Sequence, residues 1–199
     1  MSELLFNELP RPTFRWLRVN HTVSSLAGED TAVQSIAVEA NKDILSPLPV
    51  GTALLDGNYE GANKEAVHVL VEKAEGYAIN VPPKAKEVVG IRIDANARVA
   101  NRFQFIVGEG AELEVQFYVT GSGDALTNVS YLNEYDVKEA GKVVVKKVNL
   151  LPEHVQHIEH RYTKLEEKAD VEYINIEIGG SENILNYYHD LVGQESRMV

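Results

Sequence analysis

The sequence feature that most constrains the fold is a turn that recurs at nearly constant spacing. From about residue 50 onward, short runs of β-branched and aromatic residues alternate with glycine, asparagine and aspartate, as strands and turns do. Each recurring turn holds a small residue, at intervals of 26 to 29 residues. These small residues are Ala85, Ala111, Ala140, Ala169 and Ser196. Self-similarity at a period of about 20–50 residues is typical of a stacked repeat.

A period of this size, holding two or three strands and no helix, predicts one coil of a parallel β-helix. A single coil cannot bury its apolar face alone, whereas stacked coils turn their inward valine, isoleucine, leucine and phenylalanine side chains into a continuous core. A small residue suits the corner of each coil because a bulky side chain there would collide with the coil above. An antiparallel β-sandwich with regular turns is the main structural alternative.

Several runs in this region have strand character, and one of them alternates strictly. In residues 172–178, strict alternation places Tyr173 opposite to Ile174, Ile176 and Ile178, so that one face is buried and the other is exposed. The expected strands include residues 67–71, 90–93, 103–107, 114–119, 142–148 and 172–178. We therefore expect residues 46–199 to form the β-helix domain.

Residues 1–45 differ from the rest and predict a helical or irregular N-terminal arm. Leu4, Leu5 and Leu9 would share one face of a short helix that ends before Pro10. Trp16 is the single tryptophan, and its large apolar ring suits an anchor that holds the arm on the core. Residues 27–45 are compatible with either a helix or a weak strand.

Composition excludes several classes of function. The 199 residues contain no cysteine, so within them there is no disulfide, no thiolate nucleophile and no cysteine-ligated metal or iron–sulfur site. The net charge of −11 makes the average surface repel nucleic acid. There is neither an apolar run of about 18 residues nor a basic, apolar leader at the N-terminus, so we expect no membrane association and a cytoplasmic location.

Histidines provide the candidate metal ligands. His154, His157 and His160 recur at a spacing of three, which would place neighbouring imidazoles on one face of a helix but on opposite faces of a strand. The surrounding sequence is strand-like, so we favour a structural role over a metal site. His189 precedes Asp190, as an oriented base would, but no serine or cysteine nucleophile accompanies it. We assign no catalytic residue and no cofactor-binding residue.

The order of several short motifs resembles a known family. Residues 77–83 read YAINVPP, residues 106–113 read IVGEGAEL and residues 190–196 read DLVGQES, and residues 9–16 read LPRPTFRW. Together these segments are similar to the entry, the coil corners and the N-terminal opening of the SufB/SufD family of iron–sulfur cluster assembly proteins. The resemblance implies a right-handed parallel β-helix. It also implies a non-catalytic scaffold that acts with a SufC-type ATPase and pairs with a SufB/SufD-like subunit or a second copy of itself.

The resemblance also implies that iron–sulfur clusters belong to the whole complex, with no cofactor bound by this chain alone. Members of the family usually continue past the point that corresponds to Val199, so we expect a shortened or unusually short member. Two other functions stay open at this stage, namely a carbohydrate-active β-helix enzyme and a β-sandwich binding module. The aromatic content of 8% is low for the sugar-stacking platform that the first of these needs.

Overall fold

The computed structural model describes residues 3–6, 22–25, 36–54, 64–96, 98–122 and 127–199. The described chain is almost entirely β-structure, with helix α1 (Lys64–Lys73) between the fourth and fifth strands. The strands are β1 (Glu3–Phe6), β2 (Thr22–Ser25), β3 (Ile36–Glu39), β4 (Leu45–Leu48), β5 (Gly76–Val81), β6 (Lys86–Asp94), β7 (Val99–Val107), β8 (Glu112–Thr120), β9 (Thr127–Val137), β10 (Lys142–Asn149), β11 (Val155–Leu165), β12 (Asp170–Glu177), β13 (Glu182–Leu191) and β14 (Arg197–Met198).

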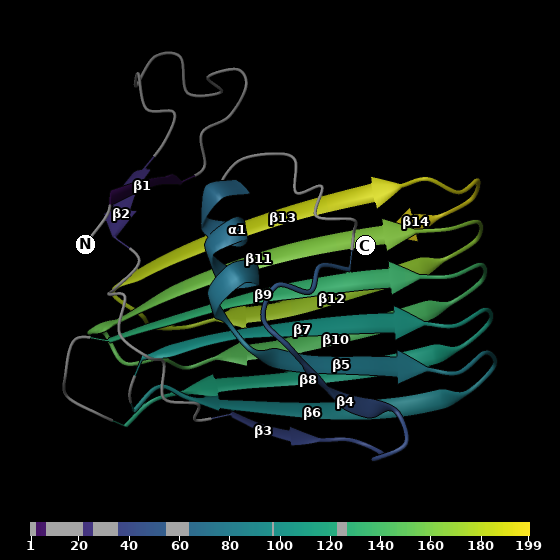
Figure 1. Ribbon diagram of the computed structural model, residues 1–199, viewed down its shortest axis with the longest axis horizontal. Helices are drawn as coiled ribbons and strands as arrows, with labels where there is room; N and C mark the ends of the chain where they lie inside the picture. Colours follow the sequence, from purple (N-terminus) through teal and green to yellow (C-terminus); the bar gives the residue numbers. More distant parts are fainter. Residues whose placement is uncertain (1–2, 7–21, 26–35, 55–63, 97, 123–126) are drawn as a thin grey trace.

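From β5 onward the chain winds into a β-solenoid of about four turns, with two strands in each turn (Figure 1). The helix-side sheet, which faces α1, has the order β13-β11-β9-β7-β5-β4, and the far sheet has the order β14-β12-β10-β8-β6-β3. Neighbouring strands from β5 to β14 run parallel in both sheets. The predicted parallel solenoid is therefore confirmed, and the antiparallel β-sandwich is wrong.

The strands that precede the solenoid pair in the opposite direction. β3 lies antiparallel to β6 and β4 lies antiparallel to β5, so both sheets begin with an antiparallel strand. The boundary between an N-terminal arm, residues 1–45, and a β-helix domain, residues 46–199, stays a prediction. Both β3, which precedes this boundary, and β4, which spans it, pair with strands of the first turn. Residues 3–6 form β1, antiparallel to β2, instead of the short helix expected there. Leu9 and Trp16 lie outside the described residues.

Strand register corrects one member of the predicted repeat. Ladder pairing aligns the first residues of the far-sheet strands in one column, so the residues just before them also align. This corner column consists of Ala85, Ala111, Gly141, Ala169 and Ser196. Ala140 therefore lies one position before the corner, with a φ of 54°. The sequence favoured Ala140 because two small residues are adjacent here, and only the register distinguishes them.

Each corner needs a left-handed residue immediately before the small one. Lys84, Gly110, Ala140, Lys168 and Glu195 all have φ between 54° and 62°. Left-handed backbone brings the side chain of an L-residue close to its own carbonyl, which glycine avoids. The corner is thus a fixed pair of positions, one left-handed and one small, repeated once in each turn.

Helix α1 replaces the strand that we expected at residues 67–71. Its buried residues are Ala66, Val67, Leu70 and Val71. Ala66 and Leu70, like Val67 and Val71, are four residues apart, which places them on one face of a helix. The β-branched valines favoured a strand by composition, but packing against the helix-side sheet decides the outcome. α1 lies across the outward face of that sheet (Figure 1), where its apolar face packs on Leu132 and Tyr162. No helix in the described part of the chain has the length and apolar character needed to span a bilayer.

The solenoid core changes character along its axis. In the first turns the inward side chains are apolar, and in the last turns many of them are polar or charged. Phe103, Phe105 and Phe117 are packed together in the apolar half, and the ring of Phe105 stacks on Tyr135 of the next turn at 4.6 Å. The aromatic stack therefore connects the apolar turns to the polar ones.

The outward face of the far sheet carries a column of alternating charge and, at its later strands, exposed isoleucines. Along the first column, Lys86, Glu112, Lys142, Asp170 and Arg197 alternate in sign from one turn to the next. Lys86 bonds Glu112 at 2.9 Å, and Arg197 bonds Asp170 at 2.5 Å. As predicted for residues 172–178, Tyr173 lies on the opposite side to the isoleucines, but neither side is fully buried, and the inward side bears the partly buried Tyr173 and Glu177. The outward side bears the exposed residues Ile174, Ile176 and Ile178.

The corner assignment predicts opposite effects for two adjacent substitutions. Ala140→Gly should raise the free energy of unfolding by about 1 kcal/mol, because glycine adopts the left-handed conformation without a steric cost. Gly141→Val should lower it by about 1–3 kcal/mol through overpacking, since a Cβ there lies 2.9 Å from the Lys138 carbonyl oxygen and from the Val137 side chain. Urea unfolding measures both. If Ala140→Gly lowered the free energy of unfolding and Gly141→Val raised it, Ala140 would be the small corner residue.

Candidate functional site: a charged cluster inside the solenoid

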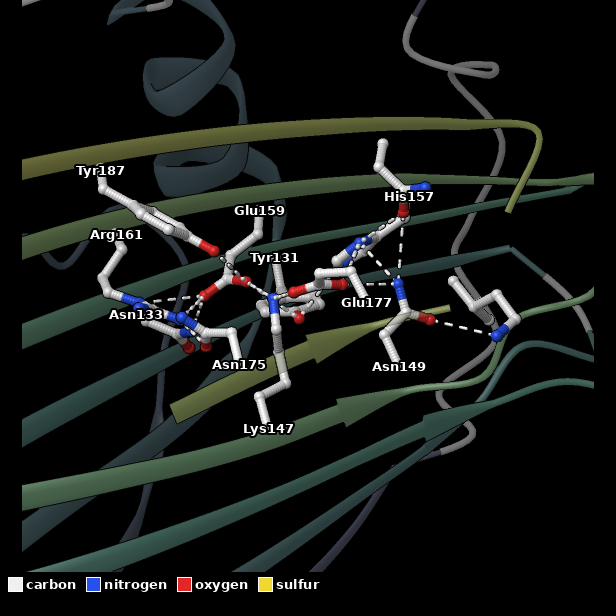
Figure 2. Close-up of polar contacts among 12 residues, drawn as sticks. Tyr131, Asn133, Lys147, Asn149, His157, Glu159, Arg161, Asn175, Glu177 and Tyr187 are labelled. Carbon is white, nitrogen blue, oxygen red and sulfur yellow. Dashed lines mark hydrogen bonds and ion pairs between the residues drawn. The ribbon is translucent and has the colours of Figure 1, made fainter. Parts of the chain in front are cut away.

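The later turns of the solenoid carry on their inward sides a group of polar and charged side chains, most of them buried, which is drawn in Figure 2 and which we call the charged cluster. Strand alternation produces it. On β11 every second residue points inward, so His157, Glu159 and Arg161 enter the core between Val155 and Leu165, and all of them are fully buried. Stacking then brings inward polar residues of the neighbouring strands against them. The cluster consists of Tyr131, Asn133, Lys147, Asn149, His157, Glu159, Arg161, Asn175, Glu177 and Tyr187.

Glu159 lies at the centre of the cluster. Its Oε1 accepts hydrogen bonds from Arg161 Nη2 at 2.6 Å, Arg161 Nε at 3.1 Å and Asn133 Nδ2 at 3.0 Å. Its Oε2 forms an ion pair with Lys147 Nζ and accepts a bond from the Tyr187 hydroxyl at 3.4 Å. Burial alone would raise the pKa of Glu159, but Arg161 and Lys147 hold it well below its usual range. Glu159 is therefore a carboxylate at neutral pH.

The charges of the cluster balance. Lys147 bridges Glu159 and Glu177, and Arg161 pairs with Glu159, so the cations and the carboxylates are equal in number. Removing charged groups from water costs several kcal/mol each, and this cost is offset only when every group is paired and hydrogen-bonded. The arrangement thus depends on all its members being present.

Arg161 is also held by aromatic rings. Its guanidinium carbon lies 4.2 Å from the ring centroid of Tyr173 and 4.2 Å from that of Tyr187. Such cation–π contacts contribute about 2 kcal/mol or more when they are desolvated. Burial alone would lower the pKa of Arg161, but Glu159 raises it above its usual value. The guanidinium is fixed in position and permanently charged.

His157 is the neutral member of the cluster. Its Nε2 lies 3.0 Å from the Tyr131 hydroxyl, and its Nδ1 lies 3.0 Å from Asn149 Nδ2 and 3.2 Å from Asn183 Oδ1. Burial, together with the nearby charge of Lys147, lowers the pKa of His157 to about 4. The imidazole therefore serves as a hydrogen-bonding link and carries no charge at neutral pH.

The structure separates the histidines that sequence spacing had grouped. His154 lies in the turn before β11, His157 points into the core, and His160 points to the opposite face of the helix-side sheet. Because strand β11 lies between the imidazoles of His157 and His160, the two do not share a site. His189 lies on the inward side of β13, with its ring 5.5 Å from that of Tyr173. In the described residues no group of three or more histidine, aspartate and glutamate side chains is placed to hold a metal ion.

A second buried charged pair lies on the opposite face of the same sheet, beneath α1. Arg102 is fully buried and donates from Nη1 to the carbonyl of Val71, in the last turn of α1, at 3.1 Å. It also bonds the carbonyl of Thr52 and lies 3.6 Å from Glu134. One arginine thus fastens the helix and the segment at residue 52 to the sheet, which indicates a structural role.

Sequence analysis missed the charged cluster, although the strand pattern contains a signal for it. In residues 142–149, Lys147 has the same parity as the apolar residues Val143 and Val145, whereas Lys146 has the opposite parity. A charged residue that points inward can be recognised only when it is known which face of the strand points inward. The pairing register with the neighbouring strands shows which face that is. The cluster offers fixed charges and hydrogen bonds but no unengaged nucleophile, since carboxylates occupy the amine of Lys147.

The fold and this interior define a parallel β-solenoid with an apolar first half and a charged second half. The family model for the SufBD core domain of the SUF system for iron–sulfur cluster assembly matches residues 91–199. The match covers more than half of the chain and includes the whole charged cluster, so this chain belongs to the SufBD core-domain family. The predicted resemblance is confirmed. Comparisons with curated proteins and with solved structures gave no match.

Two adjacent lysines provide a matched test of the charged cluster. Lys147→Met should lower the free energy of unfolding by about 3–5 kcal/mol, because it leaves Glu159 and Glu177 without their shared cation. Lys146→Met removes an exposed lysine whose Nζ lies 2.8 Å from Glu114, and should cost less than about 1 kcal/mol. Equal effects of the two substitutions, measured by urea unfolding, would contradict the described interior.

The buried histidines predict that stability falls in mild acid. The folded pKa values of His157 and His160 are about 4, both below the ordinary value of 6.5 and both lowered by burial. Between pH 6.5 and 4 the unfolded chain therefore binds protons that the folded chain excludes, so the free energy of unfolding decreases as pH falls. The slope should approach about 1.4 kcal/mol per pH unit for each histidine.

Urea unfolding at a series of pH values from 7 to 4 measures this slope. His157→Gln should reduce the slope, because it removes one of the imidazoles that the folded chain keeps unprotonated. An unfolding free energy that does not vary over this range would show that the imidazoles are not excluded from protonation.

Proposed function

We propose that this chain is a non-catalytic scaffold subunit of SUF iron–sulfur cluster assembly and acts in the cytoplasm with a SufC-type ATPase. The observation that carries the proposal is the match of residues 91–199 to the SufBD core domain. Membership of this family implies a role in the SUF system, whose components of this type are generally non-catalytic. The interior supports a scaffold, because its charged side chains are paired with one another inside the core.

The chemistry of the chain indicates how the work is divided in such a complex. Iron–sulfur clusters are held mainly by cysteine thiolates, and these 199 residues contain none. We therefore expect sulfur and nascent clusters, which are the cargo of the system, to be held by thiolates of a partner chain. The role proposed for this subunit is to hold that partner in position.

The pairing surface that we propose lies at β12, and its occupant is a SufB/SufD-like subunit. The isoleucines Ile174, Ile176 and Ile178 are 44%, 47% and 59% exposed. These isoleucines form an apolar patch on the outward face of the far sheet, and exposed apolar patches of this kind mark contacts with other protein subunits.

The carbohydrate-active alternative lacks comparable support. Its chemistry needs a pair of carboxyl groups that reach a sugar. Glu159 and Glu177 face the solenoid interior and are engaged by Lys147 and Arg161. The scaffold is therefore the function that the structure supports best.

Co-expression tests the proposal and the pairing surface together. The chain carries an affinity tag and is expressed with the SufC-type ATPase and the SufB/SufD-like protein encoded in the same genome. We expect both to co-purify, with the subunit masses given by native mass spectrometry. Ile176→Asp should remove the SufB/SufD-like subunit because it places a charge in the apolar contact. Val88→Asp, at an exposed position on β6 of the same sheet, should not.

Two outcomes would contradict these expectations separately. Recovery of neither protein with the wild-type chain would count against the scaffold function itself. Recovery of both proteins, unaffected by Ile176→Asp, would leave the function standing and would move the pairing surface away from β12.

A further inference from the structure

Polar atoms around Arg161 point to a binding site that lies beyond the proposed function. Within the described part of the chain, Arg161 Nη1, the Tyr135 hydroxyl, Asn133 Oδ1 and His189 Nδ1 are buried and have no hydrogen-bonding partner. These residues face the interior from β9, β11 and β13. A buried polar atom without a partner costs about 1–3 kcal/mol, and native proteins contain few of them.

The ring of Tyr173 brings these groups close to one another. It lies 4.2 Å from the guanidinium carbon of Arg161, 6.2 Å from the ring of Tyr135 and 5.5 Å from that of His189. Asn133 is the direct ladder partner of Arg161 on the neighbouring strand. The four atoms therefore belong to one region of the core, with Arg161 and Tyr173 at its centre.

The chemistry of the atoms selects the ligand. Arg161 Nη1 can only donate, Asn133 Oδ1 can only accept, and the Tyr135 hydroxyl can do either. Water both donates and accepts, so it satisfies atoms of each kind. A halide or another simple anion only accepts, and it would also add a negative charge to a cluster whose charges already balance.

We propose that ordered water binds inside the solenoid between Arg161 and Tyr135, with Asn133 and His189 as further partners. Buried waters of this kind typically make about three hydrogen bonds to groups that would otherwise be unsatisfied. The water completes the coordination of Arg161, whose other donors are already taken by Glu159 and Asn175. It thereby holds the guanidinium in place against the rings of Tyr173 and Tyr187.

A crystal structure of the full chain, grown once with sodium chloride and once with sodium bromide, tests the identity of the ligand. We expect electron density within hydrogen-bonding distance of Arg161 Nη1 and the Tyr135 hydroxyl, with no anomalous signal from bromide. An anomalous peak there would identify an anion and overturn the proposal. Direct bonds between these side chains, or the absence of density beside them, would also overturn it.

The sign of one stability change tests the site in solution. If water binds the Tyr135 hydroxyl, Tyr135→Phe removes a hydrogen bond and should lower Tm by about 2–4 °C. If the hydroxyl has no partner, the same substitution removes an unsatisfied group, and Tm should stay the same or rise. Tyr118→Phe, at an exposed position on the outward face of β8, is the matched control and should leave Tm unchanged.

Discussion

Parallel stacking of each turn directly on the previous one is the constraint on which the rest of this structure depends. The ladders join the same position of successive turns, so each residue of a turn lies directly against its counterparts in the turns above and below. The corner shows this most clearly, since a left-handed residue and a small residue follow each other there in every turn. Register thus converts a sequence period into columns of side chains.

The same stacking explains how charged side chains are tolerated in a protein core. Each inward residue has neighbours above, below and across the solenoid, and those of Glu159 include Arg161 on its own strand, Asn133 on the preceding one and Lys147 on the opposite sheet. Because partners arrive from several strands, the carboxylate is nearly saturated with hydrogen bonds.

The sequence period was sufficient to predict the parallel solenoid and most of the corner column, because both follow from spacing. Residues 67–71 were mistaken for a strand because their valines favour strands by composition, while the helical spacing of Val67, Leu70 and Val71 was the better signal. The charged cluster could not be predicted, because it depends on whether the odd-numbered or the even-numbered residues of each strand point inward. Lys146 and Lys147 are indistinguishable by residue type, and only the neighbouring turns show which of them is buried.

The alternating charges at the start of the far-sheet strands have a consequence for how the solenoid can grow or shorten. Opposite charges stand on neighbouring turns only while each turn keeps its own neighbours, and the column consists of Lys86, Glu112, Lys142, Asp170 and Arg197. Deleting an inner turn, or duplicating any single turn, would place two like charges on neighbouring turns, whereas inserting or removing two adjacent inner turns would preserve the alternation. Electrostatics along this column therefore favours changes in length by pairs of turns, and it penalises a folding chain that skips one.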